Sequence, residues 1–212
     1  GSYLEDQDMW RLSGIFRDVI LINKPVTEIS DIFATSVFKN GGYDSAELTV
    51  RFDVANLVDN CEVLINVFDG NEVVKTSKIC DVTNKNQVEF DFDKVKPWSH
   101  EFPNLYKIEI TLSIDGKFTD KRAIRFGFRE IKTTRYENGK APMILLNGIP
   151  LKIKGVNRHE FHPEHGHAVS EELIRKDLEI IKANNINAIR NSHYPNSRAF
   201  YDLCDEMGIL VM

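Results

Sequence analysis

The 212-residue sequence lacks the features that would tie it to membranes or to disulfide bonds. Its three cysteines, Cys61, Cys80 and Cys204, are an odd number with no Cys-x-x-Cys pair, which is typical of thiols in a reducing compartment. No apolar run approaches the roughly 20 residues needed to span a bilayer, and the first residues lack the basic and apolar regions of a signal peptide. We therefore expect a soluble, cytoplasmic protein with no membrane partner.

An excess of positive charge is also missing. Lys and Arg number 27 against 32 Asp and Glu, which gives a formal net charge of −5. Without an electropositive surface to neutralise phosphates, nucleic acid is not an expected partner. No Gly-x-Gly-x-x-Gly follows a predicted strand, which weakens a dinucleotide-binding interpretation. What is present is 42% apolar and 28% charged residues over the length of one or two domains, which predicts a globular fold with a real core.

Residues 30–128 alternate apolar and polar side chains with a period of two. In residues 46–54 and again in 106–114 the apolar positions share one face, and Asp115-Gly116 then supplies a tight turn. Further strands are expected at residues 32–37, 63–68, 73–79, 88–92 and 118–126. About seven short strands in about 100 residues predict an immunoglobulin-like β-sandwich, and the pattern alone leaves other antiparallel sandwiches open.

After Arg129 the pattern changes to an alternation of strands and helices. We expect strands at residues 151–156, 187–190 and 208–212, a helix that starts at the N-cap Ser170 and ends near residue 184, and a helix over 197–206. This β-α-β-α-β order with long connections predicts parallel strands. An open doubly wound sheet and the start of a (β/α)8 barrel both fit it.

Five of the six histidines lie in this last segment: His159, His162, His165, His167 and His193. One interpretation is a solvated polar loop. A metal site is a second, although His159-Glu-Phe-His162 is not His-Glu-x-x-His and Pro163 interrupts any helix there. In a third, His159 and His193 converge, because both follow predicted strands whose carboxyl ends would open on one face.

The third interpretation also predicts the kind of ligand. Arg158, Arg190 and Asn196 would lie near the two histidines, and Tyr194 could cover an apolar ring face. A sugar needs such a set of fixed donors and acceptors, while a phosphate or a carboxylate remains an alternative. At the other end of the chain, residues 4–11 form either an acidic solvated tail or the end of a preceding domain whose Asp6 or Asp8 serves a ligand or cation.

Several separated motifs resemble the β-galactosidases of glycoside hydrolase family two, and the resemblance covers essentially the whole chain. The motifs are Tyr3-Leu-Glu-Asp-Gln-Asp-Met-Trp-Arg-Leu-Ser-Gly-Ile-Phe-Arg-Asp18, Trp98-Ser-His-Glu-Phe-Pro-Asn-Leu-Tyr106, Gly127-Phe-Arg129, Asn147-Gly-Ile-Pro150, Gly155-Val-Asn-Arg-His-Glu160, Arg190-Asn-Ser-His-Tyr-Pro-Asn196 and Leu203-Cys-Asp205. The resemblance implies three domains: the end of a jelly-roll sugar-binding domain in residues 1–24, an immunoglobulin-like sandwich in 25–128, and an incomplete (β/α)8 catalytic domain in 129–212.

The resemblance also implies roles for individual residues. Asp8 matches an aspartate that binds galactose hydroxyls and a sodium ion, and His159 and His193 match histidines that contact the sugar in the transition state. Arg190 would support these two histidines from behind. The implied activity is hydrolysis of terminal β-galactosides such as lactose by a glycosidase of carbohydrate metabolism, with magnesium and sodium as cofactors.

The sequence departs from the family in one respect. Retaining glycosidases need two carboxyl groups about 5 to 5.5 Å apart, and in this family they are glutamates on later barrel strands. The acid/base glutamate of the family is preceded by Asn, and the only Asn-Glu pair here, Asn71-Glu72, lies in a predicted sandwich turn. Both catalytic glutamates and the magnesium ligands would lie beyond Met212, so we expect the chain alone to be inactive.

A non-catalytic module that binds carbohydrate or another protein is the alternative function. Against it, Ile189, Leu210 and Val211 lie on strands without barrel neighbours, which would leave unpaired edges and apolar faces. The same edges predict self-association through a second copy of the chain.

Overall fold

The computed structural model describes residue 12 and residues 14–135 and 141–212, which form two compact units. The sandwich unit comprises residues 22–99 and 104–150, and the α/β unit comprises residues 1–21, 100–103 and 151–212 as far as they are described. Neither described helix is long and apolar enough to cross a membrane.

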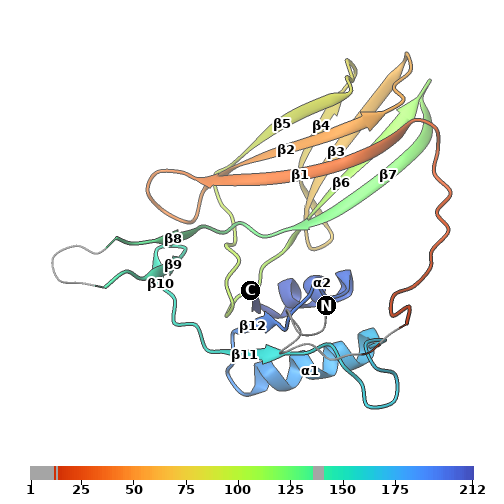
Figure 1. The fold of residues 1–212 in the computed structure, drawn as a ribbon. Coiled ribbons are helices and arrows are strands. Elements are labelled where there is room, and N and C mark those ends of the chain that lie inside the picture. Colours follow the sequence, from red (N-terminus) through yellow and green to blue (C-terminus); the bar gives the residue numbers. More distant parts are fainter. Residues whose placement is uncertain (1–11, 13, 136–140) are drawn as a thin grey trace. The chain divides into compact units, whose positions relative to one another are not determined.

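The sandwich unit consists of two antiparallel sheets (Figure 1). One has the strand order β1-β2-β5 and the other β4-β3-β6-β7. The seven strands expected from the period-two pattern are confirmed, and their bounds are β1 Glu28–Phe38, β2 Ala46–Ala55, β3 Cys61–Asp69, β4 Glu72–Ile79, β5 Lys85–Phe92, β6 Tyr106–Ile114 and β7 Lys117–Phe126.

Alternation along the strands builds the core of the sandwich. On β2, Val50 and Phe52 are buried while Arg51 between them is exposed, so one face of the strand meets the other sheet. The expected turn between β6 and β7 is present, with positive φ at Asp115 (50°) and Gly116 (71°). The immunoglobulin-like sandwich predicted from the sequence is therefore confirmed as two packed sheets.

A small three-stranded sheet in the sandwich unit was not predicted. Its strands are β8 (Ile131–Thr133), β9 (Ile144–Leu146) and β10 (Ile149–Pro150), too short to give a periodic signal. The expected turn at Asn147-Gly148 joins β9 to β10, and both residues have positive φ. The Asn147 amide Nδ2 donates to the carbonyl oxygen of Trp98 at 3.0 Å, which fastens this turn to the chain near β6.

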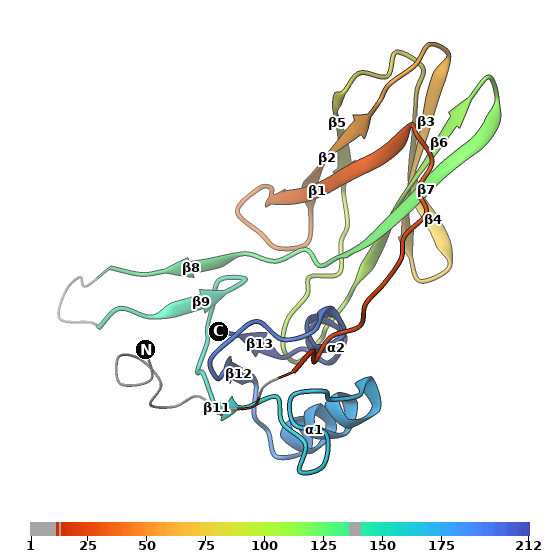
Figure 2. The ribbon, with the colours of Figure 1, turned by 45° about the vertical axis from the view of Figure 1, so that its right-hand side comes forward.

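The α/β unit has the predicted β-α-β-α-β order with three parallel strands in the order β11-β12-β13. Figure 2 shows both helices beside this sheet. The elements are β11 Gly155–Arg158, α1 Glu171–Ala183, β12 Ala188–Asn191, α2 Arg198–Met207 and β13 Leu210–Val211.

The prediction that the first strand covers residues 151–156 is wrong. The strand begins at Gly155, because the side chain of Asn187 takes the hydrogen bonds of the preceding backbone. Its Oδ1 accepts from the Lys154 N–H at 2.8 Å, and its Nδ2 donates to the Lys152 carbonyl at 2.9 Å. At its other end the strand runs further than predicted, because Asn157 and Arg158 pair with Arg190 and Asn191 of β12.

The predicted N-cap of α1 is confirmed, because Ser170 Oγ accepts from the Leu173 N–H at 3.3 Å. The prediction that the last strand starts at Gly208 is wrong: Gly208 closes α2 with φ of 69°, and β13 begins at Leu210. The helices cover β12, so Ile189 is buried and its face is not left open as the sequence suggested, whereas Val211 on β13 stays 37% exposed. The core of this unit consists of Ile174, Leu178, Ile189, Phe200, Leu203, Cys204 and Ile209.

Burial of Cys204 predicts a loss of stability in alkali. Burial raises the pKa of its thiol from the ordinary value of 9.0 to about 12, so the folded state holds this proton more tightly than the unfolded state. The resulting stabilisation is complete below about pH 9 and is lost as the pH rises toward 12. Between pH 8 and 10.5 we expect the Cys204 thiol to remove about 2 kcal/mol from the free energy of unfolding.

Urea denaturation followed by helical circular dichroism measures this effect, because both described helices lie in the α/β unit. Over this pH interval the free energy of unfolding of the Cys204→Ala variant should fall by about 2 kcal/mol less than that of the unaltered chain. The matched control is Cys80→Ala, which removes an exposed thiol and should keep the unaltered pH dependence. Equal pH dependence in both variants would contradict the prediction.

Candidate active site

The structure brings together the two histidines that were expected to converge. His159 directly follows β11, and His193 follows β12 after Ser192. Because β11 and β12 are parallel and Arg158 pairs with Asn191, the two loops leave the sheet at the same edge. The rings of His159 and His193 meet edge to face, with centroids 5.5 Å apart and planes at 90°. The two histidine rings are therefore in contact at the carboxyl ends of adjacent strands. Their contact with a sugar stays a prediction.

Buried Arg158 ties together the elements behind these rings. Its guanidinium donates to Asp177 Oδ2 on α1 from Nε at 3.1 Å and from Nη2 at 2.9 Å, and its Nη1 lies 3.5 Å from Asn196 Oδ1. Its carbonyl accepts from the Ser192 N–H at 3.0 Å. One residue thus fixes α1 and the His193 loop to the end of β11. The sequence placed Arg158 near the site, but only its burial reveals this role.

Tyr201 of α2 fixes the His193 loop from the other end. Its hydroxyl oxygen accepts from the Asn191 amide Nδ2 at 3.0 Å and from the Asn196 N–H at 3.1 Å. Both ends of the loop between β12 and α2 are therefore bonded to the helix that follows it. This network holds His193 in place through its neighbours in the chain.

The other two predicted site residues are not brought into this arrangement. Arg190 lies on β12 with its side chain exposed, and within the described part of the chain no acceptor bonds to its guanidinium. Asp8 lies outside the described residues. The support of the histidines by Arg190 and the binding of sugar and sodium by Asp8 therefore stay predictions.

The hydroxyl of Tyr194 forms hydrogen bonds within the protein. Its hydroxyl donates to the carbonyl oxygen of Glu160 at 3.1 Å and lies 2.7 Å from Nδ1 of His167, which is itself 2.8 Å from the same carbonyl. Burial is the main reason that the pKa of Tyr194 is raised above its ordinary value of 10.0. These bonds link the His193 loop to the loop that follows His159.

Glu160 is the buried residue that the sequence did not single out. Its side chain is fully buried and pairs with the guanidinium of Arg17. Glu160 sits in a stretch rich in charged and polar residues, so its sequence context resembles that of a solvated loop. Nothing in the local pattern signals a partner 143 residues away.

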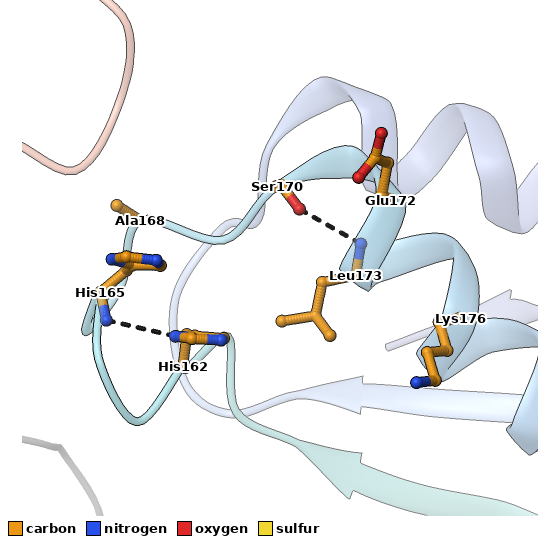
Figure 3. Close-up of a pocket in the computed structure, with 7 residues that line it drawn as sticks. All are labelled: His162, His165, Ala168, Ser170, Glu172, Leu173 and Lys176. Atoms are coloured by element: carbon orange, nitrogen blue, oxygen red, sulfur yellow. Dashed lines mark hydrogen bonds between the residues drawn. The ribbon is translucent and has the colours of Figure 1, made fainter.

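His162 and His165 lie at a separate open pocket of about 410 Å³ beside the start of α1 (Figure 3). Their rings are stacked, with centroids 4.6 Å apart. Nδ1 of His162 accepts from the N–H groups of Glu164 and His165 at 3.1 and 3.3 Å, so this nitrogen is engaged within its own loop. Among the described residues no group of three His, Cys, Asp or Glu side chains could hold a metal ion, so they give the metal interpretation no support.

Comparison with protein families identifies the chain. Residues 1–25 match a family model described as glycosyl hydrolases family 2, sugar binding domain, residues 27–129 match glycosyl hydrolases family 2, and residues 139–212 match glycosyl hydrolases family 2, TIM barrel domain. The chain belongs to glycosyl hydrolase family 2. The strands β11, β12 and β13 and the helices α1 and α2 are accordingly part of a TIM barrel domain, and the loops of His159 and His193 lie at the strand ends where such barrels build active sites. The domain limits at residues 24 and 128 stay a prediction.

The family 2 chain is similar to two curated β-galactosidases. It is 42% identical to a β-galactosidase of Pseudoalteromonas haloplanktis and 41% identical to one of Alteromonas mediterranea, in both cases over the whole chain and 21% of the relative. The chain thus spans about a fifth of the length of these relatives. Among solved structures it resembles a β-glucuronidase of Bacteroides uniformis, with 26% identity and a TM-score of 0.83 over 96% of this chain and 25% of that one.

The role of Arg158 in this family 2 fold is open to a direct test. Arg158→Met leaves Asp177 without its buried partner, and because Asp177 is partly exposed to water we expect a loss of about 1–3 kcal/mol, not the larger cost of a fully buried pair. Hydrogen exchange of the Leu178 and Ile189 amides measures the opening of this unit. The matched control is Arg198→Met, whose guanidinium is 84% exposed and lies 3.9 Å from Asp202. Similar exchange rates of these amides in both variants would contradict the role assigned to Arg158.

Proposed function

We propose that this chain is part of a retaining β-galactosidase that hydrolyses terminal β-galactosides such as lactose. The observation that carries the proposal is the identity of 41–42% to two β-galactosidases along the whole chain. The pair of histidine rings at the ends of β11 and β12 supports it, because that edge of a barrel sheet is where substrate binds.

The proposed task of this chain is to bind the sugar. The ring nitrogens of His159 and His193 form hydrogen bonds with sugar hydroxyls, and these bonds become stronger as the sugar ring flattens toward an oxocarbenium ion. Bonds that are stronger in the transition state than in the ground state raise the rate of the chemical step. Asp8 would add a carboxylate for further hydroxyls, and Arg190 would support the histidines.

The chemistry of bond cleavage lies outside these residues in our proposal. A (β/α)8 barrel has eight parallel strands, and the described part of residues 151–212 supplies β11, β12 and β13. We therefore propose that the 212-residue chain alone hydrolyses no β-galactoside. We also propose that the whole enzyme acts in cytoplasmic carbohydrate metabolism, with sodium held through Asp8 and magnesium held by residues that this chain does not contain.

A panel of substrates tests the specificity. The protein encoded by the complete gene is assayed with 4-nitrophenyl β-galactoside, β-glucuronide and β-mannoside, and the 212-residue chain is assayed beside it. We expect kcat/KM for the galactoside to be at least about 100-fold above the values for the glucuronide and the mannoside. The reason is that hydrogen-bond donors held in fixed positions bind the sugar hydroxyls. Preference for the glucuronide would overturn the galactoside assignment, and turnover by the 212-residue chain would overturn its inactivity.

We further propose that β11 and β13 promote self-association of the isolated chain. Both are outer strands of the three-stranded sheet, and an unpaired parallel edge is a template for another strand. Light scattering over a range of concentrations tests this, and a strictly monomeric species at high concentration would contradict it.

A further inference from the structure

Glu160 is a fully buried carboxylate that directly follows His159. One of its oxygens, Oε2, pairs with Arg17, while the other, Oε1, has no hydrogen-bond partner among the described residues. Taking a carboxylate out of water is costly, and a buried ion pair is often no more stable than apolar side chains of the same size. The Glu160–Arg17 pair therefore contributes little to the stability of the fold. Its contribution is to hold the two side chains in a fixed geometry.

The partner of Glu160 comes from the other end of the chain. Arg17 lies within residues 1–25, which match the sugar binding domain of the family. Its Nη1 is 3.4 Å from the Phe16 carbonyl and 3.5 Å from the His167 carbonyl, and the rings of Phe16 and His167 are 5.8 Å apart. The segment around Arg17 is thus fastened to the loop of residues 160–167, and the predicted sugar ligand Asp8 lies nine positions earlier on the same segment.

The backbone of Glu160 makes the connection to the third part of the site. Its carbonyl oxygen accepts from the hydroxyl of Tyr194, the residue after His193. Glu160 therefore adjoins His159 in sequence, holds the neighbour of His193 through its backbone, and holds Arg17 through its side chain. His167 also contacts all three segments, through the Phe16 ring and Arg17, the Tyr194 hydroxyl and the Glu160 carbonyl, but Glu160 supplies the charged partner of Arg17.

We propose that Glu160, paired with Arg17, is a positioning residue of the sugar site that fixes residues 14–21 against the loops of His159 and His193. The proposal rests on the proposed β-galactosidase function. Glu160 does not touch the sugar in this account. Its charge holds Arg17, and Arg17 holds the segment. Loss of that charge should weaken sugar binding more than it slows bond cleavage, because the cleaving groups lie elsewhere in the barrel.

Steady-state kinetics of the protein from the complete gene provide the first test. For Glu160→Gln and for Arg17→Met we expect KM for 4-nitrophenyl β-galactoside to rise about tenfold while kcat changes less than threefold. The double variant should be no worse than the worse single variant, because both changes remove one interaction. Arg17→Lys keeps the charge and should restore KM to within about threefold of the unaltered enzyme.

A matched control comes from the sandwich unit. Arg122 pairs with Glu28 at 3.1 Å and with Asp120 at 3.3 Å, and Arg122→Met removes these ion pairs from a unit that contains none of the site residues. KM should not change in this variant. Unchanged KM in Glu160→Gln, or a fall in kcat as large as the rise in KM, would overturn the proposal.

Hydrogen exchange of the 212-residue chain separates failure of this proposal from failure of the proposed function. Glu160→Gln should speed exchange of the amides in residues 14–21 and 160–167 about tenfold and leave those in α2 unchanged. Unchanged exchange in residues 14–21 overturns the proposal. If exchange responds but the unaltered protein from the complete gene cleaves no β-galactoside, the proposed function has failed. The pair is then a structural contact only, which also overturns the positioning role.

Discussion

His193→Phe in the protein from the complete gene is expected to lower kcat/KM for 4-nitrophenyl β-galactoside by about 100- to 1,000-fold. Phenylalanine keeps a ring beside His159 but removes the nitrogen atoms that would bond to sugar hydroxyls. Hydrogen bonds that tighten in a glycosidase transition state supply several kcal/mol, and about 3–4 kcal/mol corresponds to this loss of rate. Initial rates at low substrate concentration measure it.

His165→Phe is the matched control for this prediction. His165 lies in the same histidine-rich stretch, but it is exposed and lines the separate pocket at the start of α1 (Figure 3). Its replacement should leave kcat/KM unchanged. If both substitutions reduced the rate alike, the effect would belong to the stretch as a whole and not to the pair at the strand ends.

Phe52→Ala is expected to destabilise the sandwich unit by about 3–5 kcal/mol. Phe52 on β2 is 1% exposed between the two sheets, and removal of a buried aromatic ring costs its transfer free energy and leaves a cavity. Urea denaturation followed by the fluorescence of Trp98, which is buried in the same unit, reports the change in the free energy of unfolding.

Phe118→Ala removes the same side chain from a position on β7 that is 67% exposed. We expect a change of no more than about 0.5 kcal/mol, as for most surface substitutions. Equal losses in the two variants would mean that the two sheets do not enclose the core described here.

The sandwich could be predicted because its strands are long and half buried. A strand such as β2 places every second side chain in the core, and that alternation is visible in the sequence. The strands β8, β9 and β10 are only two or three residues long and leave no such signal. The start of β11 was misplaced for a different reason, since the side chain of Asn187 takes the backbone hydrogen bonds that a strand would have used.

The candidate site was predictable only where strand order determines position. His159 and His193 follow adjacent parallel strands, so their meeting follows from topology. The burial of Glu160 depends on Arg17, which is 143 residues away, and no pattern within the loop indicates it. Arg158 was noticed as a neighbour of the site, but its bonds to Asp177 and Asn196 require the helices to be in place.

The most direct measurement for the account as a whole is the stereochemistry of galactoside hydrolysis by the protein from the complete gene, followed by proton NMR. The account predicts that lactose is cleaved and that β-galactose appears first, before mutarotation, because a double displacement retains configuration. Absence of cleavage, or α-galactose as the first product, would contradict the assignment of this chain to a retaining β-galactosidase.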